Sequence, residues 1–208
     1  MARIVNIHPE SPQHRLLAQA GEFIRDGGVV ALPTDSCYAL GCQLGDKEAM
    51  DRIRLIRQIG ERHHLTLMVR DLSEIAHFAR VDNAQYRLLK AATPGSYTFI
   101  LEGTKELPRR VMHPRRKTIG LRVPDHPVAL AMLQELNEPL LTTTLQLPGD
   151  EAPLTEGWEI QDRLHDQIEL ILDAGHCGTE PTTIIDLTGR APELIRAGRG
   201  ALAPFGLD

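Results

Sequence analysis

The sequence predicts an α/β protein built on one open, twisted, mixed sheet flanked by helices. Short apolar runs alternate with segments in which apolar residues recur at helical spacing, which is typical of strands alternating with helices. The closing strands are spaced like hairpins, so antiparallel pairs are expected beside parallel ones. No repeat or low-complexity linker divides the 208 residues, and this length fits a single domain over residues 1–208.

A helix and then two strands are expected first. Ser11 and Pro12 provide a cap and a first-turn proline, and Gly27-Gly28 end the helix. Strands at 29–32 and 38–44 follow, with a short polar loop between them. The apolar face of the helix consists of Leu16, Leu17, Ala20, Phe23 and Ile24.

Aspartates mark the next three helix starts. Asp46 precedes a helix that ends near Arg57, and Asp71 and Asp82 each begin a further helix. A polar stretch at 60–64 and a short strand at 65–69 separate the first of these helices from the second. This segment therefore continues the alternation of strand and helix.

The second half of the chain continues the same pattern. Thr93-Pro94-Gly95 is a turn, because proline and glycine together end regular structure. Strands at 97–101 and 118–123 enclose a basic loop, and Asp125 is the expected cap of the helix that follows Pro124-Asp125-His126-Pro127. The remaining elements are a threonine-rich strand, one short helix and three late strands, expected at 139–147, within 150–166, and at 168–172, 182–187 and 194–197.

Composition limits the class of protein. With 42% hydrophobic and 25% charged residues the chain is typical of soluble globular proteins, and a net charge of −5 argues against binding nucleic acid over the whole surface. No apolar run approaches the length of a membrane span, and the N-terminus lacks the plan of a signal peptide. The three cysteines form no CxxC pair, so reduced thiols in a cytoplasmic protein are expected and structural zinc is disfavoured.

A polar loop, Pro33-Thr34-Asp35-Ser36, lies between the first two predicted strands. Such a loop exposes hydroxyls and backbone N–H groups at a strand end, where α/β proteins usually bind ligands. An ordinary β-turn explains the same residues when they are taken alone. The functional interpretation therefore depends on companion segments elsewhere in the chain.

Five segments together resemble the YrdC/YciO family, which contains the threonylcarbamoyl-adenylate synthases and their relatives. The resemblance covers nearly the whole chain, and it is specific only when the segments are taken together. The segments at 7–9 and 117–124 are most similar to the YciO branch. The five are Pro33-Thr34-Asp35-Ser36 with Tyr38-Ala39-Leu40-Gly41, Thr93 to Leu101, Arg122 to Pro127, Pro181 to Leu187, and Ile195-Arg196-Ala197-Gly198.

The resemblance implies an α/β fold with a positively charged concave face. Synthases of the family combine ATP, bicarbonate and L-threonine, release pyrophosphate, and supply threonylcarbamoyl-AMP for tRNA modification. The family domain has also been linked to double-stranded RNA. No metal site is expected in the chain, so any Mg²⁺ would be carried largely by the nucleotide phosphates.

Ten residues are the expected ligand contacts in the cleft. Hydroxyls and a ring for the amino acid or carbamate come from Thr34, Ser36, Tyr38 and Thr98. Guanidinium, hydroxyl and amide groups for the nucleotide phosphates come from Arg57, Arg122, Thr144, Gln146, Thr182 and Arg196. Gly198 is expected to let a phosphate or ribose approach the backbone closely.

Two departures from the synthase pattern predict weakened or altered chemistry. Arg57-Gln58-Ile59 stands where synthases carry Lys-x-Arg, and Thr144-Leu145-Gln146 stands where they carry Ser-x-Asn. Because charge develops on the leaving pyrophosphate, a missing cation slows adenylate formation. The nearby cationic or titratable side chains that offer a replacement are Arg54, Arg62, His63 and His64.

The basic loop carries a local excess of positive charge. From Lys105 to Lys117 there are six basic residues and one acidic residue, which sum to +5. RNA-backbone binding and a solvated loop are both consistent with this pattern. The expected RNA contacts are Arg109, Arg110, Arg115, Arg116 and Lys117. A weakened synthase, a non-catalytic double-stranded RNA- or nucleotide-binding protein, and an enzyme acting on another carbamate or acyl-adenylate all remain open.

Overall fold

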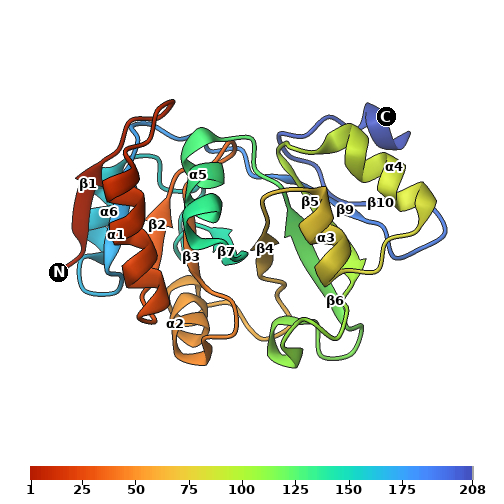
Figure 1. Ribbon diagram of the computed structural model, residues 1–208, viewed down its shortest axis with the longest axis horizontal. Helices are drawn as coiled ribbons and strands as arrows, with labels where there is room; N and C mark the ends of the chain where they lie inside the picture. Colours follow the sequence, from red (N-terminus) through yellow and green to blue (C-terminus); the bar gives the residue numbers. More distant parts are fainter. Residues whose placement is uncertain (208) are drawn as a thin grey trace.

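The computed structural model describes residues 1–207, and its strands form one mixed sheet (Figure 1). The strand order is β1-β8-β2-β3-β7-β4-β6-β5-β9-β10. Parallel pairs such as β1–β8 and β5–β9 occur in the same sheet as antiparallel pairs such as β3–β7 and β5–β6, which confirms the predicted α/β class. The strands are β1 (Arg3–Asn6), β2 (Val30–Leu32), β3 (Ala39–Gln43), β4 (Thr66–Met68), β5 (Tyr97–Glu102), β6 (Thr118–Arg122), β7 (Leu140–Thr144), β8 (Leu170–Asp173), β9 (Thr183–Asp186) and β10 (Glu193–Arg196).

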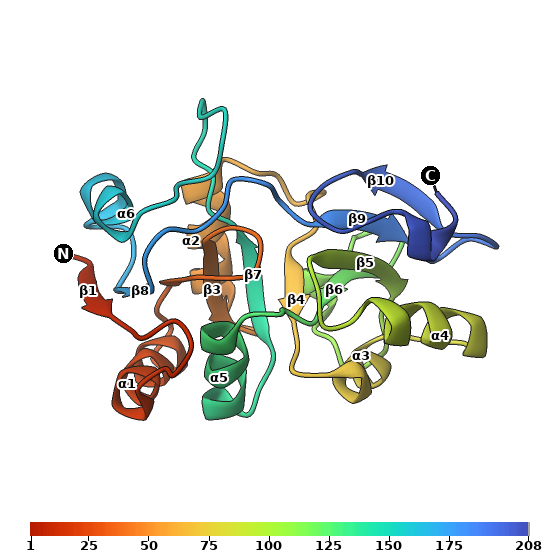
Figure 2. The ribbon, with the colours of Figure 1, turned by 90° about the horizontal axis from the view of Figure 1, so that it is seen from above.

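Helices flank the sheet on both sides (Figure 2). Helices α1 and α5 pack against each other on one side of the β2–β3 region, and α2 and α6 lie on the other side. Helices α3 and α4 lie beside the half formed by β5 and β6. No helix within residues 1–207 is long and apolar enough to cross a bilayer. The helices are α1 (His14–Arg25), α2 (Lys47–Arg57), α3 (Leu72–Phe78), α4 (Asn83–Ala92), α5 (Pro127–Leu136) and α6 (Gly157–Leu164), with 3-10 turns η1 (Arg109–Val111) and η2 (Ala203–Phe205).

Three of the predicted helix caps are confirmed. The carboxylates of Asp46 and Asp71 accept hydrogen bonds from backbone N–H groups three residues later, at 2.9 and 3.0 Å. Asp82 forms a reciprocal capping box with Gln85. Each cap satisfies a donor that the helix itself leaves unpaired, and so fixes where α2, α3 and α4 begin.

Two predictions at element ends were wrong, and one strand was missed. Helix α1 begins at His14 after Gln13, with no side-chain cap, so Ser11 and Pro12 lie outside it. The cap of α5 is His126 and not Asp125, because the Nδ1 atom of His126 accepts from the N–H of Val128 at 3.1 Å. Strand β1 was not expected, and it pairs with β8 along the sheet edge.

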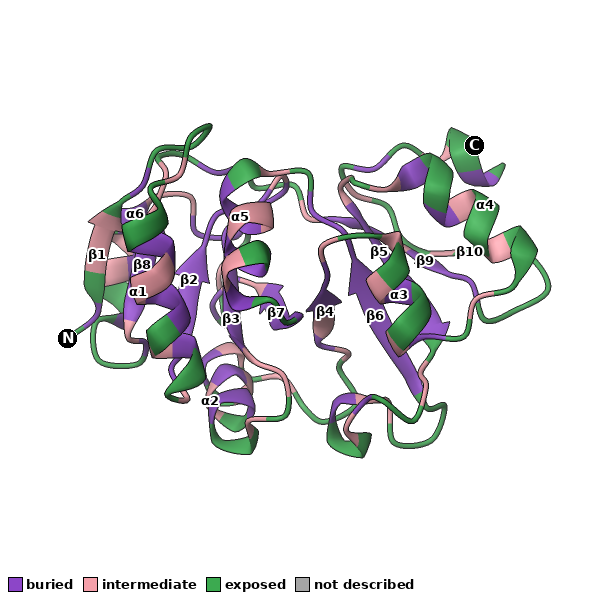
Figure 3. Ribbon diagram, viewed as in Figure 1, coloured by how far each residue is buried: buried purple, intermediate pink, exposed green. Residues whose placement is uncertain are grey.

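The core occupies both faces of the sheet (Figure 3). Leu40 and Cys42 of β3 pack into one apolar cluster, while Ala39 packs into the other with α1 and α5, as expected for strands covered on both sides. Buried polar side chains depart from this pattern, and they gather around the middle of the sheet: Thr34, Ser36, Thr98, Thr118, Arg122, Thr142, Thr143, Thr182, Thr183 and Asp186.

Candidate functional site

A cleft of about 280 Å³ opens over the middle strands of the sheet. Thr66 of β4, Gly120 of β6 and Ile100 of β5 are register partners and therefore share one face. Thr98 lies two residues before Ile100, so its side chain points to the same face. A Cβ atom on Gly120 would lie 3.1 Å from the Thr98 methyl group. The absence of a side chain at Gly120 therefore leaves space for the cleft above the sheet.

The walls come from three chain segments, and a smaller hollow continues the cleft inward. The segment after α2 contributes Arg57 and residues 62–64, the end of β7 contributes Thr144 and Gln146, and the β9–β10 region contributes Thr182 and Arg196. The inner hollow shares Thr98, Thr144 and Thr182 with the cleft and is closed by Thr34, Ser36 and Arg122. All ten predicted contacts therefore line one continuous space: Thr34, Ser36, Tyr38, Arg57, Thr98, Arg122, Thr144, Gln146, Thr182 and Arg196.

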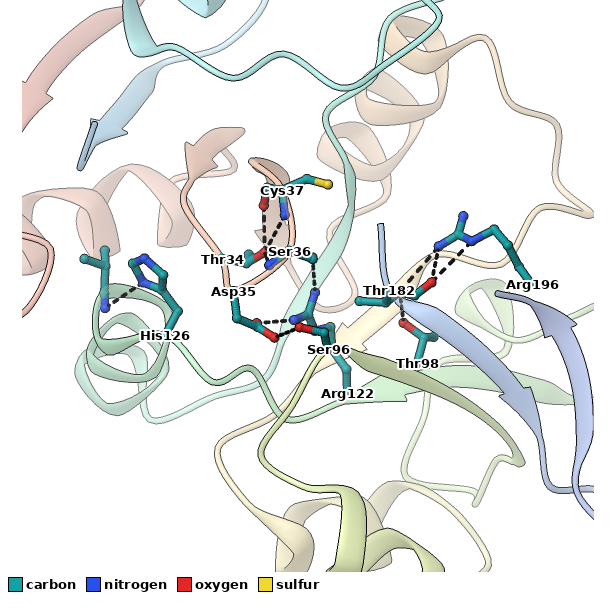
Figure 4. Close-up of polar contacts among 11 residues, drawn as sticks. Thr34, Asp35, Ser36, Cys37, Ser96, Thr98, Arg122, His126, Thr182 and Arg196 are labelled. Carbon is teal, nitrogen blue, oxygen red and sulfur yellow. Dashed lines mark hydrogen bonds and ion pairs between the residues drawn. The ribbon is translucent and has the colours of Figure 1, made fainter. Parts of the chain in front are cut away.

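The polar loop between β2 and β3 is held by its own hydrogen bonds (Figure 4). The Thr34 hydroxyl donates to the carbonyl of Cys37 at 2.6 Å and accepts from the N–H groups of Ser36 and Cys37. Its oxygen also lies 3.1 Å from the Ser36 hydroxyl. Thr34 therefore shapes the loop, and both hydroxyls lie at the wall of the inner hollow.

Arg122 is a buried cation at the end of β6, with 6% of its side chain exposed. It forms an ion pair with Asp35, and its Nη1 donates to the Ser36 hydroxyl at 3.2 Å. Ser96 donates to the other Asp35 oxygen at 2.6 Å. Burial lowers the pKa of Arg122, and the neighbouring Asp35 opposes this shift. The pair therefore fixes a positive group behind Ser36. The Nε atom of Arg122 has no hydrogen-bond partner among residues 1–207.

Arg196 stands on the opposite wall and is oriented by Thr182 (Figure 4). Its Nη2 and Nε donate to the Thr182 carbonyl at 2.8 and 3.3 Å. The Thr182 hydroxyl lies 2.8 Å from that of Thr98, so wall and floor are joined by one hydrogen-bonded chain. Arg196 has no carboxylate within ion-pair distance in the described part of the chain, and burial lowers its pKa. Its charge is therefore available to an anion.

The segment at the end of α2 adds one further cation and two imidazoles. Arg57 is the last residue of α2, its Nε is buried without a partner in residues 1–207, and burial lowers its pKa. Burial also lowers the pKa values of His63 and His64. The positive charge of Arg57 lowers the pKa of His63 further, and His113 does the same for His64. Both imidazoles are therefore mainly neutral at about pH 7.

Tyr38 and Gly198 are held differently from expectation. The ring of Tyr38 is fully buried in the core, and its hydroxyl donates to the Gly175 carbonyl at 2.7 Å. Tyr38 lines the inner hollow, but its ring packs in the core and is not free to stack on a ligand. A Cβ on Gly198 would collide with the carbonyl oxygen of Pro181. Gly198 is needed for close approach of this chain to itself, not for an approaching ligand.

The residues at the two departures from the synthase pattern are held by local contacts. Ile59 packs against the apolar core, and Gln58 adopts a left-handed conformation that ends α2. Of these three residues, only Arg57 lines the cleft. The Gln146 amide donates to the carbonyl of Asp150 at 2.9 Å. That donor is therefore committed to its own loop.

The basic loop lies outside this cleft. All five of its predicted RNA contacts are exposed, and none forms an ion pair with another residue of the described chain. Arg109 and Arg110 line a different groove, beside α2. The loop is thus a separate basic surface.

Metal and thiol chemistry find no support in the described residues. No three His, Cys, Asp or Glu side chains of residues 1–207 gather where they could hold a metal ion. Cys37, Cys42 and Cys177 are free and buried. Burial raises the pKa of the Cys37 thiol to about 11, so it is not a thiolate near neutral pH.

Sequence reasoning missed two residues of the site, Asp35 and Ser96. Asp35 lies within the polar loop but resembles a turn residue or a metal ligand in sequence. Its pairing with Arg122 joins residues that are 87 positions apart, and one sequence carries no signal of such a contact. Ser96 lies in the resembling segment 93–101, which was the available signal.

Comparison with known proteins shows the family. The Sua5/YciO/YrdC family model, described as "Telomere recombination", matches residues 22–198. "Uncharacterized protein YciO" of Escherichia coli is 53% identical over 205 residues, covering 99% of this chain and all of that protein, and its crystal structure superposes with a TM-score of 0.96.

Relatives with a stated activity are more distant. A threonylcarbamoyl-AMP synthase of Chromobacterium violaceum is 31% identical over 182 residues, covering 86% of this chain and 92% of that protein. The P. abyssi Sua5 structure complexed with L-threonine has a TM-score of 0.86 at 27% identity, covering 94% of this chain and 57% of that one. The resemblance expected from the five segments is confirmed, and the chain belongs to the Sua5/YciO/YrdC family.

Proposed function

We propose that the cleft binds ATP or AMP together with a small amino acid or carbamate, and that it supports a weakened or altered threonylcarbamoyl-AMP synthase reaction. One observation carries this proposal. Three arginines, Arg57, Arg122 and Arg196, surround one continuous cleft with a threonine floor. The likeness to Sua5 complexed with L-threonine, at a TM-score of 0.86, supports a small-molecule ligand here.

The two parts of the space suit different parts of the ligands. The inner hollow is small, about 20 Å³, with Thr34, Ser36 and Thr98 in its wall, so it suits one polar group of the amino acid or of the carbamate made from bicarbonate, with the rest of that molecule in the cleft. The outer cleft suits the nucleotide phosphates, because Arg57 and Arg196 are cations without carboxylate partners in residues 1–207. Thr144, Gln146 and Thr182 line the same space. A magnesium ion would be held by the phosphates.

The reaction would proceed by attack of the carbamate oxygen of N-carboxy-threonine on the α-phosphate of ATP. The bond between the α- and β-phosphates breaks, and pyrophosphate leaves with the negative charge that develops. Fixed cations stabilise that charge. Ile59 supplies none, so each lost charge-assisted contact costs roughly 1.5–3 kcal/mol, or about one to two factors of ten in rate.

Pyrophosphate release tests the proposal. The protein is incubated with ATP, bicarbonate and each amino acid in turn, beside the C. violaceum synthase as a positive control. We expect slow release that depends on one amino acid and falls further in Arg196→Gln. Turnover equal to the synthase would refute the weakening. Absence of both release and nucleotide binding would refute the proposed site.

A non-catalytic RNA-binding role is the second candidate, because the basic loop is a separate cluster of unpaired cations. If Arg115, Arg116 and Lys117 contact phosphates of double-stranded RNA, affinity must fall steeply with salt. Changing all three to Ala should flatten the slope of log affinity against log salt by roughly two to three units. Gel-shift titration at two salt concentrations measures this, and no binding at moderate salt would leave a solvated loop. ATP and RNA as ligands fit the cytoplasmic location that we propose.

A further inference from the structure

A second hollow lies on the far side of the segment that walls the cleft. It is a groove of about 370 Å³ between α2 and η1, within the range of small-molecule sites, roughly 300–1,000 Å³. Residues 62–64 line the cleft, whereas Glu61 lines the groove. The two hollows share no lining residue, so the groove is a site of its own.

The groove has more positive than negative charge. Lys47, Arg54, Arg109 and Arg110 line it, against the two carboxylates of Asp51 and Glu61. Asp51 is shared between Lys47 at 3.6 Å and Arg54 at 3.9 Å. Arg109 and Arg110 have no carboxylate partner in the described chain. An anion would complete this arrangement.

Arg54 makes the groove more than a patch of surface charge. Its side chain is only 15% exposed, and its Nε is buried with no hydrogen-bond partner among residues 1–207. Buried donors are nearly always paired. An oxyanion in the groove would accept from this guanidinium, while the half-buried Met112 gives the groove apolar surface and the buried Met50 lies beneath it.

We propose that the groove between α2 and η1 is a second binding site, for a phosphate-bearing small molecule whose less polar part lies on Met112. Arg54 would bind the phosphate at the inner end, and Arg109 with Arg110 would bind it from the η1 side. This assignment does not depend on the function of the cleft. It gives Arg109 and Arg110 a role distinct from that of Arg115 and Arg116, which do not line the groove.

Methionine-methyl NMR distinguishes the two hollows. The chain has five methionines; Met50 and Met112 line the groove, and none lines the cleft or its inner hollow. In titrations with inorganic pyrophosphate and with AMP, at constant ionic strength set by chloride, we expect saturable shifts of the Met50 and Met112 signals. The signals of Met1 and Met132 serve as references and should not move.

Matched variants identify the groove as the cause. Arg109→Gln with Arg110→Gln should weaken the binding seen at Met112 by about tenfold or more, as expected for loss of a charge-assisted contact. Arg115→Gln with Arg116→Gln removes the same charge from the same loop and should change the affinity measured at Met112 by less than about twofold. Arg196→Gln should leave the methionine shifts intact, so failure of the cleft does not affect this result.

Three outcomes would overturn the proposal. They are absent shifts at Met50 and Met112, equal weakening in both double variants, and shifts produced only by a double-stranded RNA. The last outcome would assign the groove to an RNA surface instead. Arg54→Gln, with a folded spectrum, provides a further check, because it should weaken binding without altering the exposed loop.

Discussion

At the scale of single residues, the cleft depends on a buried ion pair between distant parts of the chain. Asp35 and Arg122 are 87 positions apart and nearly inaccessible, with 9% and 6% of their side chains exposed. Removing one partner leaves the other charge buried and unpaired, which costs far more than losing an exposed pair. The pair is therefore a sensitive point for stability as well as for the site.

We predict that Arg122→Met lowers the free energy of unfolding by roughly 3–5 kcal/mol, because it leaves Asp35 unpaired. Adding Asp35→Leu should recover part of this loss, since no isolated charge then remains. Arg115→Met, which changes an exposed residue without an ion pair, should shift stability by less than about 0.5 kcal/mol. Urea unfolding measures all three, and equal small effects would show that the pair is not critical.

Arg196 differs from Arg122 because its charge has no carboxylate partner in residues 1–207. We predict that Arg196→Gln weakens ATP binding by about tenfold to a hundredfold, or roughly 1.5–3 kcal/mol, the value of a charge-assisted hydrogen bond. Arg190→Gln, an exposed change in the turn between β9 and β10, is the control and should have little effect. Calorimetry gives both affinities, and an unchanged value for Arg196→Gln would exclude it from the site.

At the scale of elements, helix α5 has an unusual cap. Nδ1 of His126 accepts from the Val128 N–H, which only an unprotonated Nδ1 can do. Burial lowers the pKa of His126 below its ordinary value of 6.5; Asp35 opposes this shift and Arg122 adds to it. The start of α5, which follows β6 and Arg122, therefore depends on a neutral imidazole.

This cap makes stability depend on pH. Below about pH 6.5 the unfolded chain binds a proton at this position before the folded chain does, so stability falls as pH decreases toward the folded pKa. We predict that His126→Asn, which keeps a capping acceptor, reduces the loss of unfolding free energy between about pH 7 and about pH 5.5. His126→Leu should cost about 1 kcal/mol at neutral pH. If the wild type and His126→Asn lose stability in parallel, the cap is not the cause.

Local signals explain which elements could be predicted. The helices at Asp46, Asp71 and Asp82 have carboxylate caps that act over three residues, and β2 and β3 are continuous apolar runs. Strand β1 was missed because it is four residues long and only partly buried, so its identity depends on pairing with β8.

For the site, the positions of residues along the chain were predictable, but the directions of their side chains were not. Residues near strand or helix ends, such as Arg57 and Arg196, could be assigned to one cleft because α/β sheets gather such positions. Whether a side chain faces the cleft or the core was not predictable. A shift of one residue reverses the face of a strand, and in β5 this decides that Thr98 and Ile100 face the cleft while Phe99 packs into the core.

At the scale of the molecule, the two halves of the sheet are joined without interruption. Strands β7 and β4 pair in the middle, and the cleft is built from segments on both sides of that pair. We propose that residues 1–208 form a single domain. Separate folding of either half would leave an unpaired central strand edge, which is unfavourable.

We predict one cooperative unfolding transition. Amide hydrogen exchange in rising concentrations of urea should give the same global free energy for the β1–β8 pair and for the β5–β9 pair. Separate limiting values for the two pairs would indicate two domains. Arg122→Met should lower both values equally, because the ion pair joins the β2–β3 loop to β6.

The pairing of β1 has a consequence for how the protein is made. Arg3 pairs with Leu170, and Val30 of β2 pairs with the same residue, so β1 and β2 leave the ribosome long before the strand that they share as a partner. Until β8 emerges, the nascent chain exposes one edge of β2 and leaves β1 without a partner. Pairings between distant segments form slowly, and unpaired edges favour aggregation during that delay. The edge of the sheet at β1 and β2 is therefore completed only after β8 has emerged, and until then it is a point at which the nascent chain can aggregate.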